Sequence, residues 1–353
     1  MGSPPAYSKN QVKKAGRILA NPGADGKDLE WALGVLDYWR AAHALVLSDM
    51  SRHLADAVKS ADCHESANDE VSLPLVVSRL KRTDTIVGKL CRDGSDFQLN
   101  TMYDLAGCRA VVSTVDEVYG VLECLESYPA IEIRPSRGVI DYIRESPKAN
   151  GYRSLHVITA HDVMPYGYRG MACETQIRTE LQHSWATALE TYDVIKRGRM
   201  KFGGGSPKEK RYFSLVSAAF AILEGCARVP ETPDSLGDIR DELALLEKDL
   251  GILARLRACS SSVRMINSFY NYAGAKYCIL YIDYEQQWTQ IDVFPAPQEK
   301  RAQERFNALE RKKEQMQDVL MVLVSSVKDL EAAYPNYSSD ISYFLGIMDN
   351  LAN

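Results

Sequence analysis

Short apolar runs alternate with helical segments between residues 108 and 194, and this alternation limits the possible folds more than any other feature. The run 108–112 has the character of a buried strand. Three further stretches predict strands: 131–134, 155–159 and 171–177. Helical spacing of apolar residues covers 115–128 and 179–194. This mixture predicts an α+β fold in which helices flank a mixed β-sheet.

Turn-forming segments divide the chain into four predicted parts. They are N-terminal helices over 1–62, the α+β core over 63–205, a helical extension over 206–260 and a small α/β accessory domain over 261–353. In the last part, 276–283 and 287–294 alternate like a hairpin, and a charged helix and a third strand follow. We expect the helical extension to include one long helix over 234–256.

Charge and cysteine content limit the classes of function. Asp and Glu number 47 against 42 Lys and Arg, and a chain of net charge −5 is not built to coat nucleic acid unspecifically. No run approaches the roughly 18 apolar residues of a membrane-spanning helix, and the N-terminus has no apolar signal core. The 8 cysteines form no CxxC motif and no Cys/His ligand cluster. We therefore expect a cytoplasmic protein with reduced thiols, no membrane partner and no structural zinc.

A basic segment precedes the 108–112 run. Arg79 and Lys81 come first, and Thr85, Lys89 and Arg92 then fall on one face of a predicted helix because of the 3.6-residue period. Several cations that converge on one surface suit a polyphosphate. The alternative is a solvated basic helix face.

Two acidic residues are candidates for chemistry. Asp104 stands just before the apolar strand, and alternation puts Glu174, Gln176 and Arg178 on one face of another strand. The two carboxylates could together hold Mg2+, and Glu174 could instead act as a general base on a hydroxyl. The alternative for Asp104 is a turn or helix-cap residue.

A glycine-containing loop over 147–156 presents an aromatic ring with basic neighbours. Tyr152 can stack on a base, and Arg153 and His156 can reach phosphate oxygens. The alternative is a hairpin turn that contains a packed tyrosine.

The order and spacing of these blocks resemble the synthetase domain of the RelA/SpoT family. Members of that family are pyrophosphokinases that move the β,γ-diphosphate of ATP to a nucleotide 3′-hydroxyl. The matching blocks are Arg79-x-Lys81 with Thr85 and Lys89, Asp104-Leu105-Ala106-Gly107-x-Arg109, Asn150-Gly151-Tyr152-Arg153-Ser154-Leu155-His156, and Glu174-x-Gln176-Ile177-Arg178-Thr179. The chain resembles a small, stand-alone member, because no metal-hydrolase domain precedes the blocks.

The resemblance implies a role for each matching position. Arg79 and Arg109 would sandwich the adenine of ATP. The phosphate-binding residues would be Lys81, Thr85, Lys89 and Arg92. Asp104 would carry Mg2+, with Glu174 as second ligand or as base. Tyr152 would stack on the base of the acceptor, and the other acceptor-binding residues would be Arg153, His156, Gln176 and His183.

The acceptor is less clear from the sequence. His183 lies nine residues after Glu174, where guanosine-using members commonly carry an Asn that reads the guanine edge. Toxic members of the family modify the 3′ end of tRNA, and Trp39-Arg40-x-x-His43 resembles their early helix. A basic patch would suit an acceptor stem, and it consists of Lys196, Arg197, Arg199 and Lys201. We expect transfer to the tRNA CCA end, and the alternative is synthesis of (p)ppGpp from ATP and GDP or GTP.

The C-terminal segment resembles the tail of CapRel-type fused toxin–antitoxins, which act in phage defence. In those proteins a Tyr-x-x-Tyr element plugs the ATP site until a phage protein binds the tail and releases it. Tyr334 and Tyr337 match that element. The alternative is that two tyrosines close a helix–turn–helix.

Overall fold

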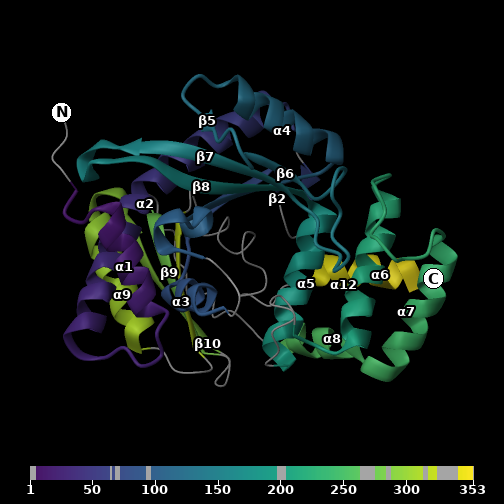
Figure 1. The fold of residues 1–353 in the computed structure, drawn as a ribbon. Coiled ribbons are helices and arrows are strands. Elements are labelled where there is room, and N and C mark those ends of the chain that lie inside the picture. The colour runs from purple at the N-terminus through teal and green to yellow at the C-terminus, as the bar shows by residue number, and fades with distance from the viewer. Residues whose placement is uncertain are drawn as a thin grey trace.

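The computed structural model describes residues 5–63, 66–67, 72–92, 97–196, 204–262, 275–283, 288–312, 317–323 and 341–352. Its main strands are β3 (Leu75–Leu80), β4 (Ala106–Val112), β5 (Glu132–Ile133), β6 (Val139–Asp141), β7 (Leu155–Val163), β8 (Tyr168–Thr179), β9 (Ala275–Asp283), β10 (Trp288–Pro295) and β11 (Gln317–Leu323). They form one sheet in the order β10-β9-β11-β3-β4-β8-β7-β5, and β6 pairs with β7 (Figure 1). Two short strands, β1 (Ser66–Ala67) and β2 (Ser72–Leu73), pair separately.

The helices around the sheet are α1 (Lys9–Leu19), α2 (Gly26–Ser60), α3 (Thr83–Leu90), α4 (Val115–Ser127), α5 (Glu180–Lys196), α6 (Pro207–Leu223), α7 (Leu236–Leu250), α8 (Ile252–Ser262), α9 (Glu299–Lys312) and α12 (Ser342–Ala352). Short 3-10 helices are η1 (Leu99–Thr101), η2 (Tyr103–Leu105), η3 (Met164–Tyr166) and η5 (Ala296–Gln298). None of the helices in the described ranges combines the length and apolar character needed to cross a membrane.

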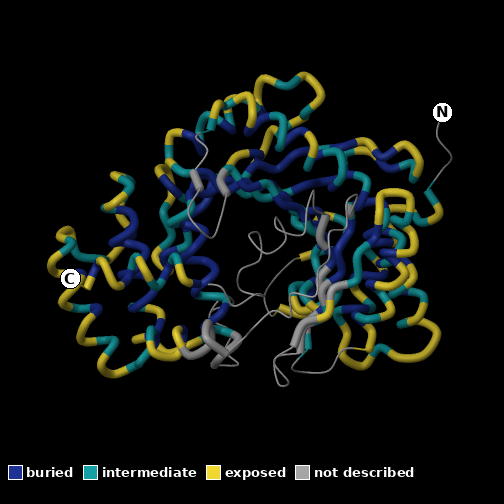
Figure 2. The backbone as a smooth tube through the Cα atoms, turned by 180° about the vertical axis from the view of Figure 1, so that it is seen from behind, coloured by how far each residue is buried: buried dark blue, intermediate teal, exposed yellow. Residues whose placement is uncertain are grey.

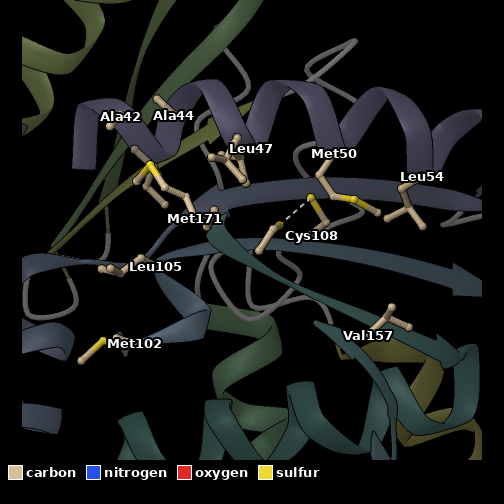
Figure 3. Packing of buried hydrophobic residues seen from close by; sticks show 14 of the residues in the cluster. Ala42, Ala44, Leu47, Met50, Leu54, Met102, Leu105, Cys108, Val157 and Met171 are labelled. Carbon is tan, nitrogen blue, oxygen red and sulfur yellow. Dashed lines mark hydrogen bonds between the residues drawn. The ribbon is translucent and has the colours of Figure 1, made fainter. Parts of the chain in front are cut away.

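One face of the sheet packs against α2. Because side chains alternate along a strand, every second residue of β4, β7 and β8 enters this core. Met50 and Leu54 of α2 lie over Cys108 and Val157 of the sheet (Figure 3). The thiols of Cys108 and Cys173 are both buried here and share a hydrogen bond over 3.9 Å, with no disulfide between them. This core fixes the sheet, so the opposite face of β4 and β8 is available for polar residues.

A second core lies among helices α5, α6, α7, α8 and α12, which gather at one end of the molecule (Figure 1). Helix α6 begins with a capping box, in which Ser206 and Glu209 satisfy each other's backbone N–H groups. Gly251 takes the left-handed conformation, with φ of 58°, and ends α7. The exposed residues lie mainly on outer turns and loops (Figure 2).

The C-terminal strands extend the same sheet. Strand β11 pairs antiparallel with β3, and Val322 lies opposite Arg79. Strands β9, β10 and β11 share a small core with α9, which centres on Phe306 and Val319. Helix α9 also contacts α2 through a buried ion pair between Arg40 and Glu310. The C-terminal part is therefore attached both to a central strand and to the long N-terminal helix.

The predicted α+β class, with a mixed sheet flanked by helices, is confirmed. The expectation of one helix over 234–256 is wrong, because Gly251 separates α7 from α8. Strand β3 was not predicted, since Ser78 and Arg79 interrupt its apolar pattern. The domain boundaries stay predictions. Some predicted site residues lie outside the described residues, namely Arg197, Arg199, Lys201, Tyr334 and Tyr337.

Gly151 gives a test of how the helical group supports the sheet. Its φ is +86°, and an added Cβ would lie 2.9 Å from the Cβ of Ser217 and 3.0 Å from the ring of Trp185. We expect Gly151→Ala to lower the free energy of unfolding by about 2 kcal/mol or more. The matched control is Gly170→Ala, where φ is +61° and nothing lies within 4 Å, so that only backbone strain of about 1 kcal/mol remains. Equal losses in urea unfolding would contradict a packing role for Gly151.

Candidate active site

The sheet face away from α2 carries the predicted catalytic and binding residues. In the parallel pairing of β4 with β8, Gly107 lies opposite Glu174 and Arg109 opposite Gln176. On the other side of β4, Arg79 lies opposite Gly107. Because Gly107 has no side chain, the space between Arg79 and Glu174 on this face stays open. Register alone therefore brings two cations, a carboxylate and an amide from three strands to the same face of the sheet.

Asp104 lies in η2, just before β4, and two lysines hold its carboxylate. Lys81 Nζ is 2.7 Å from Oδ2, and Lys89 Nζ is 3.1 Å from both oxygens. Burial alone would raise the pKa of Asp104, but the charges of Lys81 and Lys89 outweigh it and hold the pKa below its ordinary value. Asp104 is thus ionised at neutral pH, and two cations lie beside it.

Glu174 is the second carboxylate of the site. Burial raises its pKa, the charge of Asp104 adds to the rise, and the hydrogen bond from Gln176 Nε2 at 2.9 Å opposes it. A carboxylate with a raised pKa is a better proton acceptor than one fully exposed to water. Glu174 therefore has the character of a general base, whereas Asp104 has that of a permanent anion.

A hydrogen-bonded chain connects Glu174 to the predicted acceptor loop. Arg178 Nη2 donates to Tyr152 Oη at 2.8 Å and to Gln176 Oε1 at 2.6 Å. Tyr152 Oη lies 2.7 Å from His156 Nε2, and His156 Nδ1 lies 3.5 Å from Glu174 Oε1. Burial and the charge of Arg178 lower the pKa of His156 to about 3, so His156 and Glu174 are not an ion pair at neutral pH. A neutral ring accepts the Tyr152 proton at Nε2, and this assigns its own proton to Nδ1.

The donor set fits a magnesium ion that is shared with a substrate. Among the described residues, no cluster of three or more His, Cys, Asp and Glu side chains could hold a metal by itself. Mg2+ at phosphoryl-transfer sites is usually held by one or two carboxylates together with substrate phosphates. Asp104 and Glu174 supply two carboxylates, and the repulsion that raises the pKa of Glu174 is what a divalent cation relieves.

The remaining predicted residues do not all lie at this site. Thr85 and Lys89 share helix α3, and Arg92 is exposed just beyond it. Arg153 does not join the site, because its guanidinium is buried and donates to the backbone carbonyls of Ala227 and Ile143. Lys196 ends α5, and its side chain lies outside the description.

His183 lies near the start of α5, a helix that contacts β4 and β8. Its side chain is buried, and neither ring nitrogen has a hydrogen-bond partner among the described residues. Burial lowers its pKa well below the ordinary value, and the charges of Arg109 and Arg178 add to this effect. A buried imidazole with two unpaired nitrogens is costly unless a ligand satisfies it.

Three residues near the site were not predicted. Phe97 lies under the Lys89 ammonium, which is 4.6 Å from the ring centroid. Lys148 Nζ lies 3.9 Å from the Tyr142 ring centroid and 5.0 Å from that of Tyr152. Burial lowers the pKa of Lys148, while Glu174 opposes the shift. Lys148 belongs to the 147–156 loop and could have been included, whereas nothing near Phe97 in the sequence indicated a ligand.

Residues 78–193 match the family described as "Region found in RelA / SpoT proteins". The match covers all the described site residues except Lys196. The chain is 36% identical over 115 residues to GTP pyrophosphokinase YwaC of Bacillus subtilis, covering 31% of this chain and 53% of YwaC. It is 29% identical over 182 residues to GTP pyrophosphokinase YjbM of the same organism, covering 51% of this chain and 78% of YjbM. The chain thus spans about half the length of YwaC.

Among solved structures, the small alarmone synthetase 1 of Bacillus subtilis bound to its product pppGpp is similar, with a TM-score of 0.42 and 24% identity. That similarity covers 52% of this chain and 89% of the other. The family match confirms the predicted RelA/SpoT resemblance for residues 78–193.

The Tyr152 hydroxyl can be tested apart from its ring. Tyr152→Phe keeps the ring but removes the hydroxyl. His156 Nε2 then loses its hydrogen-bond donor and Arg178 Nη2 loses one acceptor, both in a partly buried position. We expect the free energy of unfolding to fall by about 1–3 kcal/mol. The matched control is Tyr142→Phe, because its ring packs against Tyr152 and its hydroxyl has no partner in the described part of the chain. Thermal and urea unfolding measure both changes, and no difference between the two variants would contradict the network.

Proposed function

We propose that this protein is an ATP-dependent pyrophosphokinase that transfers the β,γ-diphosphate of ATP to the 3′-hydroxyl of GDP or GTP. The observation that carries the proposal is the arrangement around Asp104. Two lysines surround this permanent anion, and Glu174 with its raised pKa lies close enough to interact with it electrostatically. Phosphoryl-type transfer needs charge neutralisation and an aligned hydroxyl rather than a covalent nucleophile, and this set supplies both.

The proposed step can be written with its atoms balanced. The acceptor 3′-oxygen forms a bond to the β-phosphorus of ATP, and the bond between that phosphorus and the bridging oxygen to the α-phosphate breaks. AMP leaves with the bridging oxygen. Glu174 takes the proton of the 3′-hydroxyl, and Lys81 and Lys89 turn from Asp104 to the phosphate oxygens. When bound, Mg2+ would be held by Asp104 and Glu174 and would neutralise phosphate charge.

Side chains from two strands, one helix and the residues next to them support the binding of ATP. Arg79 lies opposite Gly107 on β3, and Arg109 lies two residues further along β4 on the same face, which suits an adenine ring that contacts both guanidinium planes. Thr85 and Lys89 lie on α3, and Arg92 is just beyond it, where they suit the triphosphate. Asp104 keeps Lys81 and Lys89 close together before ATP binds.

The choice of GDP or GTP as acceptor is supported by YwaC and YjbM, two relatives that are named GTP pyrophosphokinase. Tyr152 is half-buried and lies against Tyr142, so its ring suits stacking on a base. His183 offers two unpaired ring nitrogens beside this region. An imidazole can form fewer hydrogen bonds with a guanine edge than an amide can. Substitution of His183 is therefore the most direct test of acceptor choice.

A second candidate acceptor is the 3′ end of tRNA, and the imidazole of His183 in place of an amide favours it. Lys208 and Arg211, two cations that follow the basic patch in the sequence, give this candidate little support, because Lys208 pairs with Asp249 and Arg211 with Glu242. Lys196, Arg197, Arg199 and Lys201 stay predictions for tRNA binding. The same holds for the CapRel-type role in phage defence, for a phage protein as trigger, and for Tyr334 and Tyr337 as an inhibitory plug.

The two carboxylates should both be essential for transfer. Asp104→Asn and Glu174→Gln remove a charge with little change of shape, and each should lower the transfer rate by about 100-fold or more. Glu174→Gln should lower the transfer rate by more than it lowers the ATP affinity, because Glu174 acts on the acceptor hydroxyl as well as on Mg2+. Transfer from labelled ATP and calorimetric ATP binding measure the two effects. Near-normal transfer by either variant would contradict the site.

The role of His183 in acceptor choice gives a further prediction. His183→Asn restores an amide and should raise kcat/KM for GDP or GTP by about tenfold, while His183→Ala should lower it. Unchanged kcat/KM for GDP and GTP in both variants, with no improvement of tRNA labelling in either, would exclude His183 from acceptor recognition. Parallel assays with GDP, GTP and bulk tRNA provide the comparison.

A further inference from the structure

A buried carboxylate of the C-terminal part contacts the first residue of the ATP-binding helix. Glu310 of α9 accepts a hydrogen bond from the backbone N–H of Thr83 at 2.6 Å and another from the Thr83 hydroxyl at 3.0 Å. Arg40 of α2 donates to Glu310 at 3.1 Å and to the Thr83 hydroxyl at 3.0 Å. The side chains of Arg40 and Glu310 are only 1% and 3% exposed. Three elements that are distant in sequence therefore meet at one buried, hydrogen-bonded ion pair.

Helix α3 caps only part of its own first turn: the carboxylate of Asp84 accepts a hydrogen bond from the backbone N–H of Thr85 at 2.7 Å, whereas the N–H of Thr83 has no acceptor within the helix. Its N-cap residue, Arg82, makes no side-chain hydrogen bond to the helix N-terminus. The first turn of a helix leaves backbone N–H groups without partners, and an acceptor carboxylate there also interacts favourably with the helix dipole. Glu310, 227 residues further along the chain, supplies that acceptor. The start of this 8-residue helix is therefore held by the C-terminal part of the protein.

The helix positions a lysine of the site. Lys89 lies near the end of α3, and its ammonium is 3.1 Å from both oxygens of Asp104. A shift of the first turn would move Lys89 relative to Asp104, because a short helix moves as one body. The neighbouring strand β3, which carries Arg79, is held by the C-terminal part as well, through its pairing with β11.

We propose that Glu310 is a positioning residue for ATP: by capping α3 it sets where Lys89 meets the triphosphate. This inference rests on the proposed function, since it takes Lys89 as a phosphate ligand. It gives the C-terminal strands and α9 a supporting role in ATP binding, because they hold both ATP-binding elements, β3 and α3, from outside the matched region 78–193.

The decisive variant removes the whole buried pair. Arg40→Met/Glu310→Leu replaces it with apolar side chains of similar volume, a change that usually leaves stability intact because no lone charge stays buried. The N–H of Thr83 then loses its acceptor. We expect a melting midpoint only slightly below that of the parent, because a single capping hydrogen bond is lost, and an ATP affinity about fivefold weaker or more. The KM for ATP should rise while the KM for the acceptor stays unchanged. Calorimetry and steady-state kinetics of the full chain measure these quantities.

Two controls separate capping from simple attachment of α9. Arg311→Ala removes an exposed ion pair between α9 and Asp37 of α2 without touching α3, so ATP affinity should stay that of the parent. Glu310→Gln keeps an oxygen acceptor for Thr83 and should lie within about twofold of the parent. Thr83→Val removes only the bridging hydroxyl and should weaken ATP binding about two- to threefold.

Parental ATP affinity in the double variant overturns the proposal, and so does a KM for the acceptor that rises in step with the KM for ATP. If the melting midpoint shows that the double variant does not fold, Thr83→Val decides, and parental ATP affinity in that variant overturns the proposal. A parent that binds ATP but modifies neither GDP nor GTP counts against the proposed function alone, since the ratio of affinities between variants and parent still decides on Glu310.

Discussion

The parallel pairing of β4 with β8 is the constraint on which the rest of the site depends. It sets Gly107 beside Glu174 and Arg109 beside Gln176, and it places Asp104 at the end of the same strand pair. The α2 core holds the other face of these strands, so their register cannot slip by one residue without turning Cys108 and Cys173 outward. The polar face is thereby fixed by apolar packing on the opposite side, and this rigidity allows two carboxylates to lie close together.

The surroundings of the two carboxylates shift their pKa values in opposite directions. Asp104 has two lysines as partners and a lowered pKa, whereas burial raises the pKa of Glu174 and Asp104 adds to the rise. One fold thus provides an anion that gathers cations and a carboxylate that can accept a proton. Both lysines lie in or next to elements that the C-terminal part contacts. Lys81 directly follows β3, which pairs with β11, and Lys89 lies on α3, whose first residue contacts Glu310. Residues far outside the region of family similarity therefore hold two elements of the proposed nucleotide site.

Local sequence spacing was enough to predict many of the residues that gather at the candidate site. It could not predict contacts between segments far apart in the chain. Asp104, Glu174 and Gln176 were found because a strand repeats every two residues and because their blocks follow the family order. Arg153 was predicted beside Tyr152, but neighbouring residues in extended chain point to opposite sides, and Arg153 binds backbone carbonyls instead. The pairing of β11 with β3 and the contact of Glu310 with Thr83 join segments more than 200 residues apart, and no periodicity records such contacts. The α+β class followed from the alternation of strands and helices, whereas β3 was hidden by its polar residues.

The stoichiometry of AMP release tests the central claim most directly. ATP labelled at the α-phosphate in one sample and at the γ-phosphate in another is incubated with the protein, Mg2+ and GDP or GTP, and the products are separated. Pyrophosphate transfer predicts one AMP for each acceptor that takes up γ-label, with no ADP. The formation of ADP with labelled inorganic phosphate, and no labelled acceptor, would contradict the account.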